Sequence, residues 1–216
     1  MSLTLHFHPL SSFCQKALVA LYENGTPFTP QLLDPTDTEA VARFRALWPI
    51  GKIPVLQDEA AGLTLPEASI IIEYLDRHYP GPAPLLPAEP GLAMQTRLRD
   101  RVFDLYVNVP MQKIVTDRLR PEKSRDAYGV AEARAALRTV CDMLEAEMAG
   151  RTWATGESFT MADCAAAPSL YYANLVMPLA EAHPNTAAYL DRLMQRPSFA
   201  RAVEEAAPYR DLFPWD

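Results

Sequence analysis

Two adjacent serines, Ser11 and Ser12, stand where a short alternating segment meets a helical pattern. A serine in this position commonly caps the helix, because its hydroxyl satisfies a backbone N–H that has no partner in the first turn. The same hydroxyl lies where the helix dipole favours an anion, so it is also suited to stabilising a thiolate. We expect both roles to be used, with Ser12 as the cap and Ser11 facing a ligand.

A proline opens a predicted strand in the segment Gly51-Lys52-Ile53-Pro54-Val55. Proline cannot donate to a strand ladder, so it belongs at a first or edge position. A cis bond before Pro54 would turn the Ile53 backbone N–H and C=O outward for a peptide-like ligand. Only about 5% of X–Pro bonds are cis, so a trans bond with no such role is the alternative.

Glu67 begins a strongly apolar helical segment. An acidic residue in a first turn usually compensates the helix dipole. Alternatively, Glu67 receives the ammonium of a ligand while free N–H groups at the same helix end receive its carboxylate. The two groups together would hold the end of an α-amino acid.

The spacing of apolar residues predicts the strands and helices that position these residues. Alternation predicts short strands, and spacings of three and four predict helices, with Gly25 ending the first helix. The strands are expected at 3–7, 26–33, 53–57 and 63–65, and the first helices at 12–24, 38–47 and 67–78. This order is βαβ followed by ββα.

The second half of the chain shows almost no strand pattern. Closely spaced prolines make 80–90 a stiff linker. Helical patterns follow at 92–119, 126–148, 161–176, 185–196 and 198–206, with Pro110 predicting a kink or break in the first. We expect an α/β domain over 1–79 and an all-helical domain over 91–216.

Composition excludes several classes of function. The 216 residues carry a net charge of −7, which argues against nucleic acid and anionic lipid as partners. No apolar run has the length of a membrane span. Cys14, Cys141 and Cys164 form no CxxC pair, and the N-terminus lacks the features of a signal peptide. A cytoplasmic protein is expected.

Four segments carry a resemblance to a known family. They are Ser11-Ser12-Phe13-Cys14, Lys52-Ile53-Pro54-Val55-Leu56, the helix from Glu67 through Tyr74-Leu75, and Phe159-Thr160-Met161-Ala162-Asp163. In this order they resemble the cytosolic glutathione S-transferase superfamily, with a serine-type, bacterial-like member as the best match. The resemblance spans nearly the whole chain. It implies a thioredoxin-like first domain, an all-helical second domain, and a capping box in which Asp163 serves folding rather than catalysis.

The resemblance implies glutathione as co-substrate, no metal, and a small hydrophobic electrophile as second substrate. Ser11 would be the catalytic residue, its hydroxyl hydrogen-bonded to the glutathione sulfur. The implied glutathione-binding residues are Phe13, Lys52, Ile53, Pro54, Glu67 and Ala68. The electrophile pocket is expected at Leu10, Tyr106, Val109 and Met111. A homodimer is implied, and peroxide reduction, isomerisation and dehalogenation remain open beside conjugation.

Ala68 departs from the family pattern, which has Ser or Thr directly after the acidic residue. The serine comes one position later, as Ser69. One residue rotates a helical side chain by about 100°, so Ser69 cannot simply replace the missing hydroxyl. We therefore expect weak glutathione binding. A second hypothesis is that the chain is a non-catalytic binding or scaffold protein of the transferase fold.

Other residues have competing interpretations. Cys14 is a rival nucleophile for Ser11, against the alternative of a small buried apolar residue. His6 and His8 share one strand face and could bind a metal, but no third ligand lies nearby in sequence.

Overall fold

The N-terminal half contains a four-stranded sheet whose strand order is β2-β1-β3-β4. The computed structural model describes residues 3–215; residues 1, 2 and 216 of the expected domains lie outside the described residues. β1 (Leu3–Phe7) runs parallel to β2 (Thr29–Leu32) and antiparallel to β3 (Val55–Asp58), which pairs with antiparallel β4 (Leu63–Pro66). This topology confirms the predicted thioredoxin-like arrangement.

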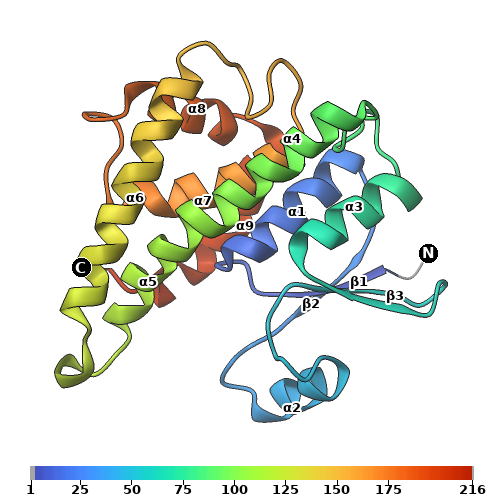
Figure 1. Ribbon diagram of the computed structural model, residues 1–216. Helices are drawn as coiled ribbons and strands as arrows, with labels where there is room; N and C mark the ends of the chain where they lie inside the picture. The colour runs from blue at the N-terminus through green and yellow to red at the C-terminus, as the bar shows by residue number, and fades with distance from the viewer. Residues whose placement is uncertain (1–2, 216) are drawn as a thin grey trace.

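Two helices cover one face of the sheet and a third lies on the other side (Figure 1). α1 (Ser12–Asn24) and α3 (Ala68–His78) lie between the sheet and the helical half, whereas α2 (Thr38–Leu47) lies apart, below the sheet in this view. The alternation of β1 puts Leu3, Leu5 and Phe7 into the core that the sheet forms with α1 and α3. As predicted, α1 ends at Gly25, which has the left-handed conformation that glycine adopts most easily (φ 63°).

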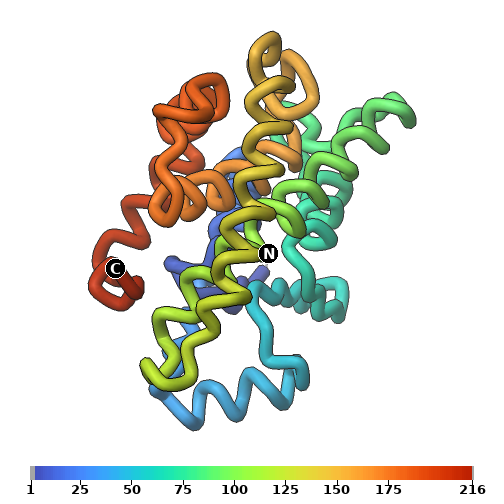
Figure 2. The backbone as a smooth tube through the Cα atoms, turned by 60° about the vertical axis from the view of Figure 1, so that its left-hand side comes forward, coloured from blue at the N-terminus to red at the C-terminus, as the bar shows by residue number. Residues whose placement is uncertain are grey.

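The C-terminal half is helical, as predicted, and its helices pack around the buried α7 (Figure 2). In order, its elements are α4 (Pro90–Arg101), the π-helix η1 (Val102–Asn108), α5 (Val109–Arg118), the short 3-10 helix η2 (Glu122–Ser124), α6 (Ala127–Met148), α7 (Met161–Val176), α8 (Pro184–Met194), α9 (Pro197–Ala206) and the 3-10 helix η3 (Ala207–Leu212). Within residues 3–215, no helix combines the length and apolar composition that crossing a membrane requires.

Pro110 does not break the helical path. α4, η1 and α5 follow one another along a single rod, and the seven-residue π-helix ends directly before Val109. Proline lacks the N–H that a regular helix would use, and a π-turn is a common way to absorb such a defect. The helical pattern expected over 92–119 is thus present, and the irregularity expected at Pro110 takes the form of a π-helix directly before it rather than a break.

The capping box before α7 is confirmed. Asp163 is fully buried, and its Oδ2 accepts the backbone N–H of the N-cap residue Thr160 at 2.8 Å. Its Oδ1 accepts hydrogen bonds from the Ala154 N–H (2.8 Å) and the Tyr189 hydroxyl (2.6 Å). Asp163 thus fixes the start of the central helix, which contacts α1, α4 and η1.

Candidate functional site

The ends of β3 and β4 bring Pro54 and Glu67 together. Val55 is paired with Pro66, so Pro54 and Glu67 are the next residues outward on neighbouring strands. The Ile53–Pro54 bond is cis, which confirms that prediction. Among residues 3–215, Glu67 is the one non-glycine residue with positive φ (70°), a conformation that costs about 1–3 kcal/mol.

Glu67 is the N-cap of α3, and its side chain makes no hydrogen bond to the helix. The first N–H groups of a helix have no intrahelical partner. Ala68 and the residues after it therefore present donors at the same point where Glu67 presents a carboxylate. This combination suits a ligand end that carries both an ammonium and a carboxylate group.

A cavity of about 130 Å³ lies at this point. It is lined by Phe13, Trp48, Lys52, Ile53, Pro54, Pro66, Glu67 and Ala68. The structure thus brings together the six residues implied to bind glutathione, whereas Ser11, the implied catalytic residue, does not line this cavity. Trp48 and Pro66 were not predicted. Trp48 follows the last residue of α2 directly before a Pro-Ile-Gly turn, and only the folded turn places it beside Lys52.

Ser11, and not Ser12, is the N-cap of α1. The Ser11 N–H donates to the His8 carbonyl at 3.0 Å, which closes a turn and makes Ser12 the first helical residue. Ser11 Oγ accepts the Cys14 N–H at 3.4 Å. The expectation that Ser12 caps the helix is therefore wrong: Ser12 is buried, and its Oγ accepts a hydrogen bond from Gln112 Nε2 at 3.4 Å.

Cys14 is fully buried among apolar residues. Burial raises the pKa of its thiol to about 12, although hydrogen bonds to Ser11 and the His8 backbone act in the opposite direction. A nucleophilic cysteine needs a lowered pKa and access to its substrate. The structure therefore favours the apolar interpretation of Cys14 over the nucleophilic one.

The residues expected to form an electrophile pocket do not share a cavity. Met111 is 3% exposed and belongs to the helical core. Tyr106 and Val109 line a groove of about 700 Å³ between η1, α5 and α6. Leu10 lies elsewhere, in a narrow pocket with Tyr172 and residues of the C-terminal segment. The expectation came from the resemblance, which implied that the helix containing Tyr106, Val109 and Met111 lines the pocket; in the structure this segment spans the π-helix η1 and the start of α5.

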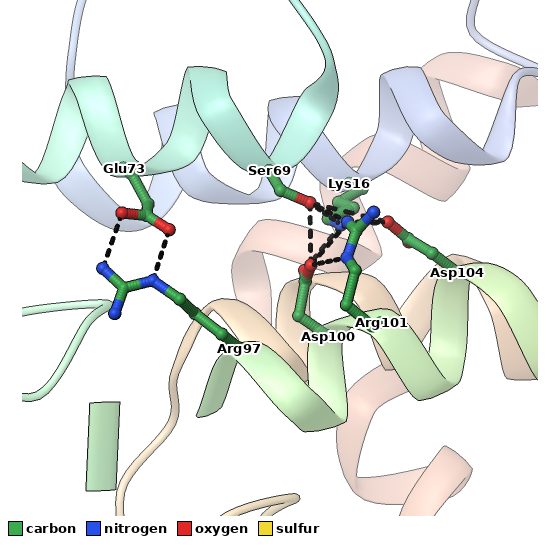
Figure 3. A network of polar contacts seen from close by, with 7 residues as sticks. All are labelled: Lys16, Ser69, Glu73, Arg97, Asp100, Arg101 and Asp104. Atoms are coloured by element: carbon green, nitrogen blue, oxygen red, sulfur yellow. Dashed lines mark hydrogen bonds and ion pairs between the residues drawn. The ribbon is translucent and has the colours of Figure 1, made fainter. Parts of the chain in front are cut away.

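Ser69 does not line the cavity and lies in a cluster of charged residues between the two halves (Figure 3). Its Oγ donates to Asp100 Oδ2 at 2.7 Å and accepts from Lys16 Nζ at 2.8 Å. This confirms that Ser69 does not replace the hydroxyl missing at Ala68. The sequence analysis did not identify this cluster.

The cluster joins α1 and α3 to the rod of α4 and η1. Lys16 Nζ lies 2.6 Å from Asp100 Oδ1 and 2.8 Å from Asp104 Oδ2, and the Lys16 and Asp100 side chains are each 1% exposed. Arg101 also contacts Ser69, Asp100 and Asp104. Burial raises the pKa of Asp104, against the charge of Lys16, which lowers it. Polar residues at 100 and 104, one turn apart in a helix, are the sequence feature that marks this cluster.

The two histidines of β1 and the following turn each have a protein partner. His6 Nε2 lies 2.6 Å from Gln57 Oε1. His8 Nδ1 accepts the Leu10 N–H at 3.2 Å, and its ring lies against Tyr209. Both contacts are structural, and neither histidine lines the cavity beside Glu67.

Known proteins resemble this chain in both halves. Residues 5–83 match the family model "Glutathione S-transferase, N-terminal domain", and residues 127–192 match "Glutathione S-transferase, C-terminal domain". A glutathione S-transferase from Methylobacterium radiotolerans, solved in complex with glutathione sulfonate, is 30% identical with a TM-score of 0.80, covering 94% of this chain and 95% of that one. One from Methylobacillus flagellatus, solved with glutathione bound, is 26% identical with a TM-score of 0.83, covering 93% and 98%.

A curated relative has a different name. The stringent starvation protein A homolog of Histophilus somni is 24% identical over 209 residues, which cover 95% of this chain and 92% of that protein. Like the matches to the solved transferases, this match spans nearly all of both chains. With both family models matched and a solved member 30% identical over almost its full length, the chain belongs to the glutathione S-transferase superfamily.

Proposed function

We propose that the protein is a glutathione transferase, which adds the glutathione thiolate to small hydrophobic electrophiles. The observation that carries this proposal is the cavity between Glu67 and the Ile53–Pro54 segment. Glu67 receives the γ-glutamyl ammonium, the Ile53 backbone pairs with the cysteinyl backbone, and Lys52 meets the glycyl carboxylate. In this proposal the expected domain 1–79 supplies the glutathione site.

The chemistry assigned to Ser11 follows from its hydrogen bond. Because Ser11 Oγ accepts the Cys14 N–H, its own hydroxyl hydrogen is available to donate to a bound sulfur. A hydrogen bond to the charged form lowers the pKa of the glutathione thiol, and the thiol proton passes to solvent. The thiolate then forms a bond to the electrophilic carbon as the leaving group departs, with no general base required.

Calorimetric titration with reduced glutathione tests the site directly. Wild-type protein is expected to bind with a Kd of about 1 mM or tighter, corresponding to about −4 kcal/mol. Glu67→Ala is expected to weaken binding, because the ligand ammonium then has no counter-charge. Glu59→Ala, on the turn between β3 and β4, is the matched control and is expected to bind as wild type does. Absence of heat with millimolar glutathione would contradict the proposal.

We also propose that two copies of the chain form a homodimer. Apolar residues are exposed along α3, α4, η1 and the start of α5. They are Ile70, Met94, Leu98, Leu105 and Val109. Leu105 and Val109 also line the groove of about 700 Å³ between η1, α5 and α6. A second copy would remove this surface from water, and a monomer in analytical ultracentrifugation at micromolar concentration would contradict the dimer.

A non-catalytic binding or scaffold protein is the second candidate. Ala68 favours it, since one side-chain hydroxyl toward the ligand carboxylate is missing. Relatives named stringent starvation protein A homolog, rather than glutathione S-transferase, also match nearly the whole chain. Turnover of wild-type protein with an activated aryl halide separates the candidates: a transferase converts it at the expense of free thiol, and a scaffold leaves both unchanged.

A further inference from the structure

The ligand carboxylate needs a partner that the first turn of α3 does not supply by its side chains. Ala68 has no hydroxyl, and the hydroxyl of Ser69 is bonded to Lys16 and Asp100. A glutathione γ-glutamyl group carries an α-carboxylate beside its α-ammonium. We propose that Arg101 binds this α-carboxylate; the assignment rests on the proposed function and names the side chain that completes its site.

Arg101 contacts the first turn of α3, whose first residue, Ala68, lines the cavity; the Arg101 side chain itself lies just outside the lining residues. α3 begins at Ala68, and the Arg101 guanidinium is hydrogen-bonded to Ser69 Oγ, on the next residue. Figure 3 shows Arg101 rising from its helix to lie between Ser69 and the two aspartates. A cation is therefore held at the helix end where Glu67 and the free N–H groups are found, and the helix dipole there also favours an anion.

The guanidinium has donors to spare. Its Nε donates to Asp100, and its Nη2 bonds Ser69, Asp100 and Asp104. Nη1 has no hydrogen-bond partner among residues 3–215. The Arg101 side chain is 44% exposed, whereas the Lys16 and Asp100 side chains are each 1% exposed. Arg101 is thus the member of the cluster that reaches solvent with an unused pair of N–H groups.

The charges around Arg101 match a zwitterionic ligand end. Burial acts to lower the pKa of Arg101, but the charges of Asp100, Asp104 and Glu67 together keep it above its ordinary value. Lys16 and Arg101 balance Asp100 and Asp104, which leaves Glu67 as the negative charge at the cavity. The α-ammonium of the ligand pairs with Glu67, and the α-carboxylate on the same carbon atom pairs with Arg101.

Arg97 provides a matched control. It lies one turn before Arg101 on α4 and also pairs with α3, through two hydrogen bonds of 2.8 Å to Glu73. Figure 3 shows this pair separated along α3 from the cluster at Ser69. Removing Arg97 therefore removes a contact between the same two helices without touching the ligand end.

The experiment compares two peptides by calorimetry. One is glutathione, and the other is γ-aminobutyryl-Cys-Gly, which keeps the amine and lacks the α-carboxylate. Arg101→Gln is expected to weaken glutathione binding about tenfold to a hundredfold, as for loss of a hydrogen bond to a charged group. It is expected to leave binding of the decarboxylated peptide unchanged, and Arg97→Gln is expected to change neither.

A further variant separates Arg101 itself from the charge of the cluster. Arg101→Gln leaves one excess negative charge, which Asp104→Asn in the same chain removes. The double variant is expected to keep the selective loss for glutathione. Ala68→Ser added to Arg101→Gln is expected to restore part of the affinity, because it supplies the missing hydroxyl.

Each result decides between the assignments. Equal weakening of both peptides in Arg101→Gln would show a purely structural role and overturn the proposal, as would unchanged binding of glutathione. Full glutathione affinity in the Arg101→Gln/Asp104→Asn double variant would also overturn the proposal, because the loss in Arg101→Gln would then come from the excess negative charge of the cluster. Wild-type protein that binds neither peptide would instead overturn the proposed function, and the Arg101 assignment with it.

Discussion

Ser69 Oγ lies 2.7 Å from Asp100 Oδ2, so the first turn of α3 is hydrogen-bonded directly to α4. The same aspartate pairs with Lys16 of α1. The two helices that carry Ser11 and Glu67 at their N-terminal ends therefore both contact the same residue of the helical half, Asp100. The position of Ser11 and Glu67 therefore depends on hydrogen bonds and ion pairs made by other residues of the same helices, Lys16 and Ser69.

The first prediction concerns this point of attachment. Lys16→Met removes the buried cation shared by Asp100 and Asp104 and leaves them only the partly exposed Arg101, and breaking a buried pair from one side costs about 3–5 kcal/mol. We expect that loss in the free energy of unfolding, measured with urea. Arg97→Met breaks an exposed pair between α3 and α4 and is expected to cost about 1 kcal/mol or less. Similar losses in the two variants would contradict this account.

The sequence predicted those features of the fold that local patterns determine. The bounds of α1, α2 and α7 follow from apolar spacing and, for α7, from the cap residue Thr160, and all three are confirmed. The residues around the cavity were identified by resemblance, and the structure brings them together. Local rules did not decide which serine caps α1, because the turn from His8 to Ser11 sets that choice.

Features that depend on distant residues were not predicted. Lys16 is separated from Asp104 by most of the N-terminal half, and nothing in either segment specifies the other as its partner. The π-helix η1 likewise replaces regular helix between α4 and α5; Tyr106 and Val109 line the groove beside α6, whereas Met111 is buried in the helical core. A sequence read with regular helical spacing has no means of locating such a change.

The second prediction concerns acid stability. The Tyr79 hydroxyl, at 2.5 Å, lowers the pKa of Asp58; burial opposes this effect, and the Tyr74 hydroxyl, at 2.7 Å, adds to it. A carboxyl with a lowered pKa stabilises the fold above its unfolded pKa of about 3.9, and this contribution is lost as the pH falls through the folded value.

Asp58→Asn tests this directly. The difference in unfolding free energy between wild type and Asp58→Asn is expected to be largest near neutral pH and to shrink below about pH 4. Urea unfolding at a series of pH values measures it. Asp37→Asn, at the exposed cap of α2, provides a control with retained capping geometry. A difference for Asp58→Asn that stays constant down to the acid limit would contradict the assignment.

The third prediction concerns Cys14. With a thiol pKa of about 12 and no exposed surface, Cys14 is expected to be unreactive toward thiol reagents in the folded protein near neutral pH. Intact-mass measurement after incubation with glutathione disulfide should show no adduct at this residue. Cys14→Ala is expected to retain turnover, although the smaller side chain lowers stability. Loss of turnover in a folded Cys14→Ala protein would return Cys14 to the list of candidate nucleophiles.

The last prediction separates the two serines. Ser11→Ala removes the hydroxyl proposed to donate to the glutathione sulfur, so turnover is expected to fall by at least about tenfold while glutathione affinity changes little. The pKa of the bound thiol should rise toward the free value of about 8.5, and the ultraviolet absorbance of the thiolate followed against pH measures this shift. Because Ser11 also caps α1, the variant is expected to lose about 0.5–2 kcal/mol of stability.

Ser12→Ala is the matched control for the last prediction, since its hydroxyl contacts Gln112 and makes no helix cap. It should lose some stability and keep both turnover and the lowered thiol pKa. If the pH profile of turnover shifts to higher pH in Ser11→Ala and not in Ser12→Ala, thiolate stabilisation is assigned to Ser11. In that case turnover recovers at high pH, where the glutathione thiol ionises without the Ser11 hydroxyl. Equal effects of the two substitutions would mean that the hydroxyls act only through the structure of the helix start.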